Sequence, residues 1–357
     1  MPRTTPTRHR LPSPTRRQIL TAAGALGLGA ALTACGADDP APAGGTGTGT
    51  GTGASGPWSF KDDRGETVTA DRTPATLVAF TGTAAALHDY GVTVQGVFGP
   101  TRTADGTPDV QAGDLDIGEV TILGNEWGQF NIEKYAALAP DLLISTMYDD
   151  RGTLWYVPEE SKDKILAVGA PTVGISVYDR LLTGSLERMA ELAASLGADL
   201  RATEVTAAKK RFEDAAARLR AAAAAKPGLK ILVGSAAADM FYVSGSNLSV
   251  DLEYFKSLGV NFVEPPASAL AETGGWFETL SWENVNKYPA DLILMDNRTS
   301  AIQPADITKG TWRQLPAVKA GQVLSRENEP ILSYAKCEPV LTALAEALEG
   351  AERVSGE

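Results

Sequence analysis

Few side chains in this sequence could hold a metal ion or act as a nucleophile. The chain has two histidines and two cysteines, and only His88 and Cys337 lie beyond Cys35. A zinc or transition-metal site built from protein side chains usually takes three or four such ligands. The Gly-x-Ser-x-Gly, His-Glu-x-x-His and Cys-x-x-Cys motifs do not occur after Cys35, and no carboxylate pair is marked as catalytic. We therefore expect no enzyme activity and no protein-held cofactor, and any metal would arrive inside a ligand.

The charge of the chain excludes a further class of partner. The sequence has 32 basic and 44 acidic residues, which gives a formal charge of -12. Five arginines precede Cys35 with no acidic residue among them, so their removal takes the charge from -12 to -17. A nucleic-acid-binding protein needs a basic surface to neutralise backbone phosphates. We expect no nucleic-acid partner.

The first segment has the layout of an export signal. Basic residues up to Arg17 precede an apolar run at 19–32, which is too short to span a bilayer comfortably. Arg16 and Arg17 lie in a stretch that resembles the twin-arginine export motif, with Ile19 where that motif usually has phenylalanine. The twin-arginine and general secretory routes therefore both stay open. We predict residues 1–34 to be a signal peptide.

The signal ends in a sequence that resembles a bacterial lipobox, Leu-Thr-Ala followed by Cys35. In a lipobox the cysteine thiol carries a diacylglycerol, which anchors the protein to the outer face of the cell membrane without spanning it. Residues 35–57 are rich in glycine and threonine and are predicted to be a flexible tether. With Cys35 modified, Cys337 has no disulfide partner and is expected to be a small buried hydrophobic residue.

From about Trp58 onward, short apolar runs alternate with helical stretches, the pattern of a βα chain with parallel strands. Helical stretches at 181–196 and 199–226, rich in alanine, separate two such halves and predict a long connecting helix. We therefore divide the chain into an N-terminal lobe (58–182), connecting helices (183–227) and a C-terminal lobe (228–357). Asn131 is a predicted N-cap for a helix at 132–138. The predicted strands lie at 75–80, 94–98, 142–145, 171–176, 230–234, 261–263, 292–295 and 322–324.

One phrase occurs twice, once in each half. A glutamate in a predicted first helical turn, Glu133 or Glu283, stands eight positions before an aspartate, Asp141 or Asp291, that opens an apolar strand. The two copies of the phrase lie about 150 residues apart, and this long period favours duplication of a whole lobe over a short solenoid repeat. Two unrelated helix-to-strand units, with glutamates favoured by the helix dipole, are the alternative.

The lipobox, the tether, the two βα lobes, the connecting helix and this repeated phrase together resemble the solute-binding lipoproteins of ABC importers, specifically the siderophore and cobalamin class. The resemblance implies a class III periplasmic-binding-protein-like fold, with two α/β lobes joined by a lobe-crossing helix and a shallow ligand cleft between them. It implies a monomeric extracytoplasmic protein that binds a ferric siderophore, of the hydroxamate type by preference, and delivers it to a permease with its ATPase. Glu133 and Glu283 match the positions that dock onto permease arginines. Iron would enter only as part of the siderophore.

Aromatic and arginine side chains after the predicted strands are the expected ligand contacts. A ferric siderophore presents apolar linkers and partly negative oxygens, which flat rings and a few arginines suit. Tyr148 and Trp276 match positions where ferric-hydroxamate binders place aromatic contacts, whereas Trp127 stands where those binders can carry an arginine. The full set of expected ligand contacts is Trp127, Tyr148, Trp155, Tyr156, Tyr242, Trp276, Arg298, Tyr334, Arg102 and Arg180.

Other ligands and one other class of function stay open. Cobalamin and haem also need aromatic surfaces with a few polar anchors, whereas direct zinc or manganese capture is disfavoured by the missing histidines. The acidic charge favours neutral or cationic ferric hydroxamates over highly anionic catecholates. An exported enzyme is the less favoured alternative.

Overall fold

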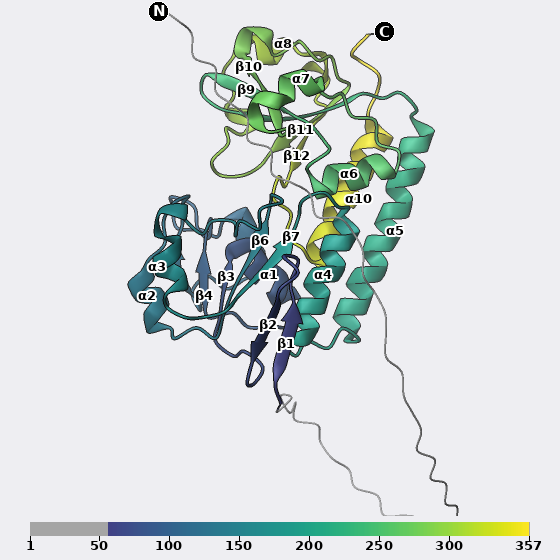
Figure 1. The fold of residues 1–357 in the computed structure, drawn as a ribbon. Coiled ribbons are helices and arrows are strands. Elements are labelled where there is room, and N and C mark those ends of the chain that lie inside the picture. Colours follow the sequence, from purple (N-terminus) through teal and green to yellow (C-terminus); the bar gives the residue numbers. More distant parts are fainter. Residues whose placement is uncertain (1–55, 357) are drawn as a thin grey trace, which may run out of the picture. The chain divides into compact units, whose positions relative to one another are not determined.

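The computed structural model describes residues 56–356, which form two α/β lobes and the helices packed beside them (Figure 1). The predicted signal peptide, Cys35 and nearly all of the predicted tether lie outside the described residues. Within 56–356, no helix has both the length and the apolar character needed to cross a membrane.

The first lobe contains a parallel sheet of five strands. The order across this sheet is β5-β4-β3-β6-β7. Every residue of β3 and β6 is buried, as expected for central parallel strands covered on both faces. The strands are β3 (Leu77–Phe80), β4 (Gly96–Phe98), β5 (Thr121–Gly124), β6 (Leu142–Met147) and β7 (Thr172–Ser176), with helices α1 (Thr81–Asp89), α2 (Ile132–Ala137) and α3 (Lys162–Leu166).

The four strands predicted in this lobe are all present, and β5 was not predicted. Asn131 caps α2 as expected, because its Oδ1 accepts a hydrogen bond from the Lys134 N–H at 2.9 Å. The lobe also carries an antiparallel hairpin that was not predicted, formed by β1 (Trp58–Lys61) and β2 (Thr67–Ala70).

The second sheet has the order β10-β9-β8-β11-β12, and only β8, β11 and β12 are parallel. The strand expected at 261–263 is wrong, since Phe262 forms a single parallel bridge with Ile231. The antiparallel strand β9 occupies this edge of β8 from Gly234 onward and leaves no room for a longer pairing. The strands are β8 (Ile231–Ala236), β9 (Met240–Ser244), β10 (Phe277–Ser281), β11 (Leu292–Asp296) and β12 (Val323–Arg326), with helices α6 (Val250–Ser257), α7 (Ala267–Leu270), α8 (Gly310–Gln314) and α9 (Pro316–Lys319).

Three helices form a layer that both lobes share: α4 (Leu182–Ser195), α5 (Thr203–Ala225) and α10 (Tyr334–Gly350). The long helices α5 and α10 lie side by side (Figure 1). Phe212 of α5 packs against Tyr254 of α6 and Tyr334 of α10, with ring centroids 5.9 and 5.5 Å apart. One hydrophobic core runs from the first sheet through these helices to β8 and β11. The expected long connecting helix is therefore present as α5.

The two aspartates of the repeated phrase make equivalent contacts. Asp141 Oδ2 accepts hydrogen bonds from the Ala75 and Thr76 N–H groups at 2.9 Å, and Asp291 Oδ2 accepts one from the Lys230 N–H at 2.8 Å. Thr76 directly precedes β3 and Lys230 directly precedes β8. Each aspartate thus ties the start of one central strand to the start of its neighbour, which supports the duplication hypothesis.

The glutamates of the phrase differ in their surroundings. Glu133 lies in the first turn of α2, whereas the helix expected around Glu283 is wrong, because Trp282–Asn284 form only a short 3-10 turn. Asn284, Val285 and a second asparagine after it are poor helix formers, which explains why the turn does not extend.

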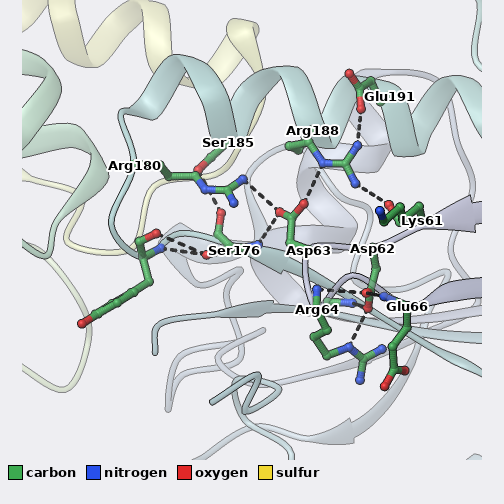
Figure 2. A network of polar contacts seen from close by, with 12 residues as sticks. Lys61, Asp62, Asp63, Arg64, Glu66, Ser176, Arg180, Ser185, Arg188 and Glu191 are labelled. Atoms are coloured by element: carbon green, nitrogen blue, oxygen red, sulfur yellow. Dashed lines mark hydrogen bonds and ion pairs between the residues drawn. The ribbon is translucent and has the colours of Figure 1, made fainter. Parts of the chain in front are cut away.

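The turn of the β1–β2 hairpin covers the outer edge of β7 (Figure 2). The Asp63 N–H donates to the Gly174 carbonyl at 3.1 Å, and Asp62 Oδ2 accepts from the Gly174 N–H at 3.1 Å. Asp63 Oδ2 accepts from the Ser176 N–H at 2.8 Å, and Arg64 Nη2 donates to the Thr172 carbonyl at 2.6 Å. Three consecutive residues of the hairpin therefore bond four outward backbone groups of this edge strand.

The Asp63 carboxylate also holds two arginines that follow β7. It accepts from Arg180 Nη1 at 2.9 Å and from Arg188 Nε at 2.7 Å (Figure 2). Its side chain is only 7% exposed. A buried carboxylate that serves three donors from two elements is costly to alter.

We predict that Asp63→Asn lowers the free energy of unfolding by about 1–3 kcal/mol, because an amide removes the charge that two guanidinium groups require. Denaturant unfolding followed by circular dichroism measures the change. Glu191→Gln is the matched control, since Glu191 also pairs with Arg188 but is 59% exposed, and we expect an effect below about 1 kcal/mol. Equal effects of the two substitutions would contradict the role given to Asp63.

The carboxyl group of Glu327 makes the stability of the folded protein depend on pH. It lies between β12 and α10, where burial raises the pKa of its carboxyl from 4.5 to about 7, an effect that Lys336 opposes and Asp251 reinforces. The folded state therefore binds the proton more tightly than the unfolded state, so this group destabilises the protein as the pH rises from about 4.5 to 7. This loss of folding stability is complete above about pH 7 and amounts to about 3 kcal/mol.

Glu327→Gln removes this loss because the amide resembles the protonated acid. We predict that the variant is more stable than the natural protein near pH 8 and that the difference shrinks near pH 4. Chemical denaturation at both pH values measures this, with Glu213→Gln on the exposed face of α5 as the control. A difference that does not change with pH would argue against the prediction.

Candidate functional site

A cavity of about 720 Å³ lies between the two lobes. Its lining includes residues that directly follow strands of both sheets: Tyr148 after β6, Val177 after β7 and Ala237 after β8. The carboxyl ends of parallel strands from both sheets thus reach the same cavity, the edge at which α/β sheets usually bind ligands.

Aromatic rings form a continuous wall across this cavity. The ring of Trp155 lies 4.8 Å from Trp127 and 4.7 Å from Tyr148, measured between centroids. Tyr148, from the first lobe, lies 6.4 Å from Trp276 of the second lobe. Phe277 and Tyr242 add a second aromatic pair, 5.0 Å apart, on the second lobe. Both lobes therefore present flat apolar surface to one ligand.

The loop that carries Trp127 is shaped by two glycines and an asparagine. A Cβ on Gly124 would lie 2.2 Å from the Gln129 carbonyl oxygen, and Gly128 has φ = +82°, so neither position accepts another residue without strain. Asn125 Oδ1 accepts from the Arg102 N–H at 2.9 Å and ties the loop to the segment after β4. Trp127 is 64% exposed at the rim of the cavity.

The backbone conformation of their own loops positions Trp155 and Trp276 in the cavity wall. The Trp155 N–H donates to the Thr146 carbonyl at 2.9 Å, and Ser145 Oγ donates to the Trp155 carbonyl at 2.8 Å, so this loop folds back along β6. Trp276 follows Gly274 and Gly275, whose φ values of +68° and +99° turn the chain immediately before it. Glycine is favoured at both positions because other residues rarely adopt such values.

A single arginine from the second lobe, Arg298, lies among carboxylates in the cavity wall. Its Nη2 donates to Asp296 Oδ2 at 2.7 Å, and its Nη1 donates to Glu329 Oε1 at 2.7 Å. Burial lowers the pKa of the guanidinium, but the hydrogen bond and charge of Asp296 and the charge of Glu329 outweigh burial and raise it above its usual value. Arg298 is therefore always charged.

Glu329 also reaches the first lobe. Its Oε2 accepts from Gln111 Nε2 at 2.6 Å and from Trp155 Nε1 at 3.2 Å. Thr299 makes a second polar contact between the lobes, since its Oγ1 donates to Asp109 Oδ2 at 2.8 Å. These contacts hold the lobes together beside the cavity.

Tyr148 lies close to the charged groups of Glu329 and Arg298. Burial and the charge of Glu329 raise the pKa of its phenol well above the usual value, despite the opposing charge of Arg298. Tyr148 is therefore a neutral hydroxyl at physiological pH and can donate a hydrogen bond to a ligand oxygen.

Six of the ten expected ligand contacts line the cavity: Trp127, Tyr148, Trp155, Tyr242, Trp276 and Arg298. They come from both lobes and from loops far apart in the sequence. The structure thus brings together most of the aromatic residues that follow predicted strands.

The other four expected contacts are not part of the cavity lining. Arg180 is held by Asp63, and Arg102 is exposed with its backbone paired to the Trp127 loop. Tyr334 is only 7% exposed and packs on Phe212 in the helical layer. Tyr156 supports the wall from behind, with its ring 5.3 Å from Phe80 and 5.0 Å from Trp127.

Several lining residues were not predicted, among them Asp149, Arg151, Phe277, Asn328 and Glu329. Glu329 had a usable signal, because it follows β12 as Arg298 follows β11. The charged run from Arg326 to Glu329 reads as a solvent-exposed loop, although Arg326 and Glu329 are 3% and 8% exposed.

The remaining candidates lie away from the cavity. Glu133 and Glu283 are both exposed, one in each lobe. Cys337 forms no disulfide within residues 56–356 and is 2% exposed, with its thiol 3.3 Å from the Ile331 carbonyl, and burial raises the pKa of this thiol. The expectation of a buried Cys337 is confirmed. Among the described residues no group of histidine, cysteine, aspartate and glutamate side chains is arranged to hold a metal ion.

The fold and the inter-lobe cavity define a binding protein, and residues 81–329 match the family model described as periplasmic binding protein. The chain therefore belongs to the periplasmic binding protein family. This confirms the predicted fold class, and it agrees with the expectation of a binding protein that acts outside the cytoplasm and is not an enzyme.

Among solved structures, the chain is similar to DesE, a ferric-siderophore receptor protein from Streptomyces coelicolor. The identity is 69%, the match covers 83% of this chain and 99% of that chain, and the TM-score is 0.82. A comparison with curated proteins found no match.

More distant structures share the fold alone. The siderophore periplasmic binding protein from the fuscachelin gene cluster of Thermobifida fusca is 22% identical, with 78% of this chain and 97% of that chain covered and a TM-score of 0.55. The FhuD protein from S. pseudintermedius is 20% identical, with 82% and 98% covered and a TM-score of 0.56.

Proposed function

We propose that this protein binds a ferric siderophore, preferably of the hydroxamate type, in the cavity between its lobes and delivers it to an ABC importer for iron uptake. The observation that carries the proposal is the aromatic wall that joins both lobes across the cavity. The 69% identity to the ferric-siderophore receptor DesE supports it.

The chemistry of the cavity suits such a ligand. In a ferric siderophore the iron is already saturated by oxygens, so the protein meets only apolar linkers and partly negative oxygen atoms. The rings of Trp155, Tyr148 and Trp276 offer apolar area, and Arg298 and Tyr148 offer hydrogen-bond donors. Hydrogen bonds to a charged group contribute about 1.5–3 kcal/mol each, and a few of them with apolar burial reach micromolar affinity.

A fluorescence titration tests this function, because Trp127, Trp155 and Trp276 line the cavity. We expect a ferric trihydroxamate to quench the tryptophan emission at micromolar concentration or below, and a ferric tris-catecholate to bind more weakly. Quenching by cobalamin or haem alone would contradict the siderophore assignment.

Trp276→Ala is expected to weaken the affinity for the ferric trihydroxamate about tenfold or more, because the substitution removes a large ring from the aromatic wall to which both lobes contribute. Isothermal calorimetry measures the change. Tyr288→Ala removes a partly buried aromatic residue of the same lobe that is not part of the cavity, and its affinity is expected to match that of the natural protein. Comparable losses in both variants would count against direct ligand contact by Trp276.

We also propose that the protein acts as a monomer, anchored by lipid at Cys35 to the outer face of the membrane. In this arrangement Glu133 and Glu283 bind arginines of the permease. Their exposure, one on each lobe, supports this proposal, because two fixed carboxylates can orient a docking protein and raise its rate of encounter.

Replacing Glu133 and Glu283 together by lysine is predicted to abolish uptake of radioactive ferric siderophore by cells and to leave the affinity of the purified protein unchanged. The matched control is the pair Glu160→Lys and Glu352→Lys, which makes the same charge change at exposed positions, again one in each predicted lobe. Normal uptake by the Glu133 and Glu283 variant, or loss of its ligand affinity, would refute the docking role.

A further inference from the structure

The guanidinium group of Arg298 has carboxylates on two sides. Its Nε and Nη2 donate to Asp296, and its Nη1 donates to Glu329 at 2.7 Å. Asp296 and Glu329 are 2% and 8% exposed, so both carboxylates are withdrawn from water. Each terminal nitrogen still keeps one N–H that is not used in these bonds, and the Arg298 side chain is 31% exposed.

Among the charged lining residues that the structure describes, these three leave a charge that no neighbouring ion pair balances. Asp149 is paired with Arg151 at 2.9 Å, and Asp251 is paired with the buried Arg326 at 2.8 Å. The two pairs cancel. Asp296, Arg298 and Glu329 together leave one negative charge in the wall.

This charge lies on side chains that are almost fully buried, so water screens it little. Two charges in a partly buried site interact several times more strongly than in bulk water. A ligand with a negative charge is repelled there and one with a positive charge is attracted, although the free N–H groups of Arg298 can still bind neutral oxygen atoms.

We propose that Glu329 and Asp296 set the charge selectivity of the cavity: they turn Arg298 from a receptor for anions into a hydrogen-bond donor for uncharged oxygens. The cavity then accepts cationic and neutral ferric chelates and discriminates against anionic ones. This inference rests on the proposed function and specifies the class of chelate that the site takes.

Glu329 can be neutralised while its contact with Gln111 is kept, at the cost of the longer 3.2 Å hydrogen bond from Trp155 Nε1. Gln111 Oε1 is buried and has no hydrogen-bond partner in the part of the chain that the structure describes, whereas Gln111 Nε2 donates to Glu329. In Glu329→Gln, a half-turn of the Gln111 amide presents this oxygen to the new amide donor. Asp296→Asn is a second, independent way to remove the excess charge.

The test uses three linear ferric trihydroxamates that share one iron centre and differ only at one end. The end carries a free amine (one positive charge), an acetylated amine (no charge) or a succinylated amine (one negative charge). We expect the natural protein to bind the amine form about tenfold more tightly than the succinylated form, with the acetylated form between them.

In Glu329→Gln and in Asp296→Asn, the difference between the amine and succinylated forms is expected to fall to threefold or less. Glu159→Gln is the control, because it makes the same charge change at a side chain that is 79% exposed and outside the cavity. It should keep the full discrimination. Circular dichroism of each variant verifies folding. If one of the two variants fails to fold, the other still provides the test.

The outcomes separate the inference from the function on which it rests. Equal binding of the three chelates by the natural protein, or undiminished discrimination in a folded Glu329→Gln or Asp296→Asn variant, overturns the charge selectivity alone. Failure of the natural protein to bind any of the three overturns the proposed function and the selectivity with it.

Discussion

The packing of both lobes against one layer of helices is the constraint on which the binding site depends. The hydrophobic core passes from the first sheet through α4, α5 and α10 to β8 and β11 without a break. Phe212, near the middle of this layer, packs against aromatic rings from α6 and α10. Moving one lobe would disturb packed side chains, and the cost of such repacking keeps the cavity largely preformed.

The polar contacts near the cavity also resist movement of one lobe against the other. Glu329 binds Gln111 and Trp155 of the first lobe and Arg298 of the second, and Thr299 binds Asp109. Since these groups are mostly buried, breaking them on opening would leave unpaired polar atoms. A preformed cavity loses less entropy when it takes up a bulky, rigid chelate.

The sequence predicted the elements whose signal is local. Buried parallel strands such as β3 and β6 are continuous apolar runs, and Asn131 is a recognisable helix cap. The antiparallel strands β9 and β10 were missed because the regular βα pattern of the first lobe was expected to continue. The alternating burial in β1 carried a readable period of two, but a strand of four residues gives a weak signal.

The difference between local signals and contacts distant in the sequence also explains which site residues could be predicted. Strand ends could be located, so Tyr148, Trp155 and Arg298 were found. Whether a side chain at a strand end faces the cavity depends on partners that are distant in the sequence. Arg180 follows β7 as expected, but Asp63, which lies more than a hundred residues earlier, holds it elsewhere. Tyr334 has a helix partner, Phe212, that no local pattern indicates.

The hairpin turn over β7 has a consequence for how copies of the protein behave together. An uncovered strand at the margin of a sheet is a template on which a second molecule can add a strand. Here Asp62, Asp63 and Arg64 occupy the hydrogen-bonding groups that such a molecule would need. Copies of the protein at high local concentration are thereby protected at this margin against self-association into aggregates.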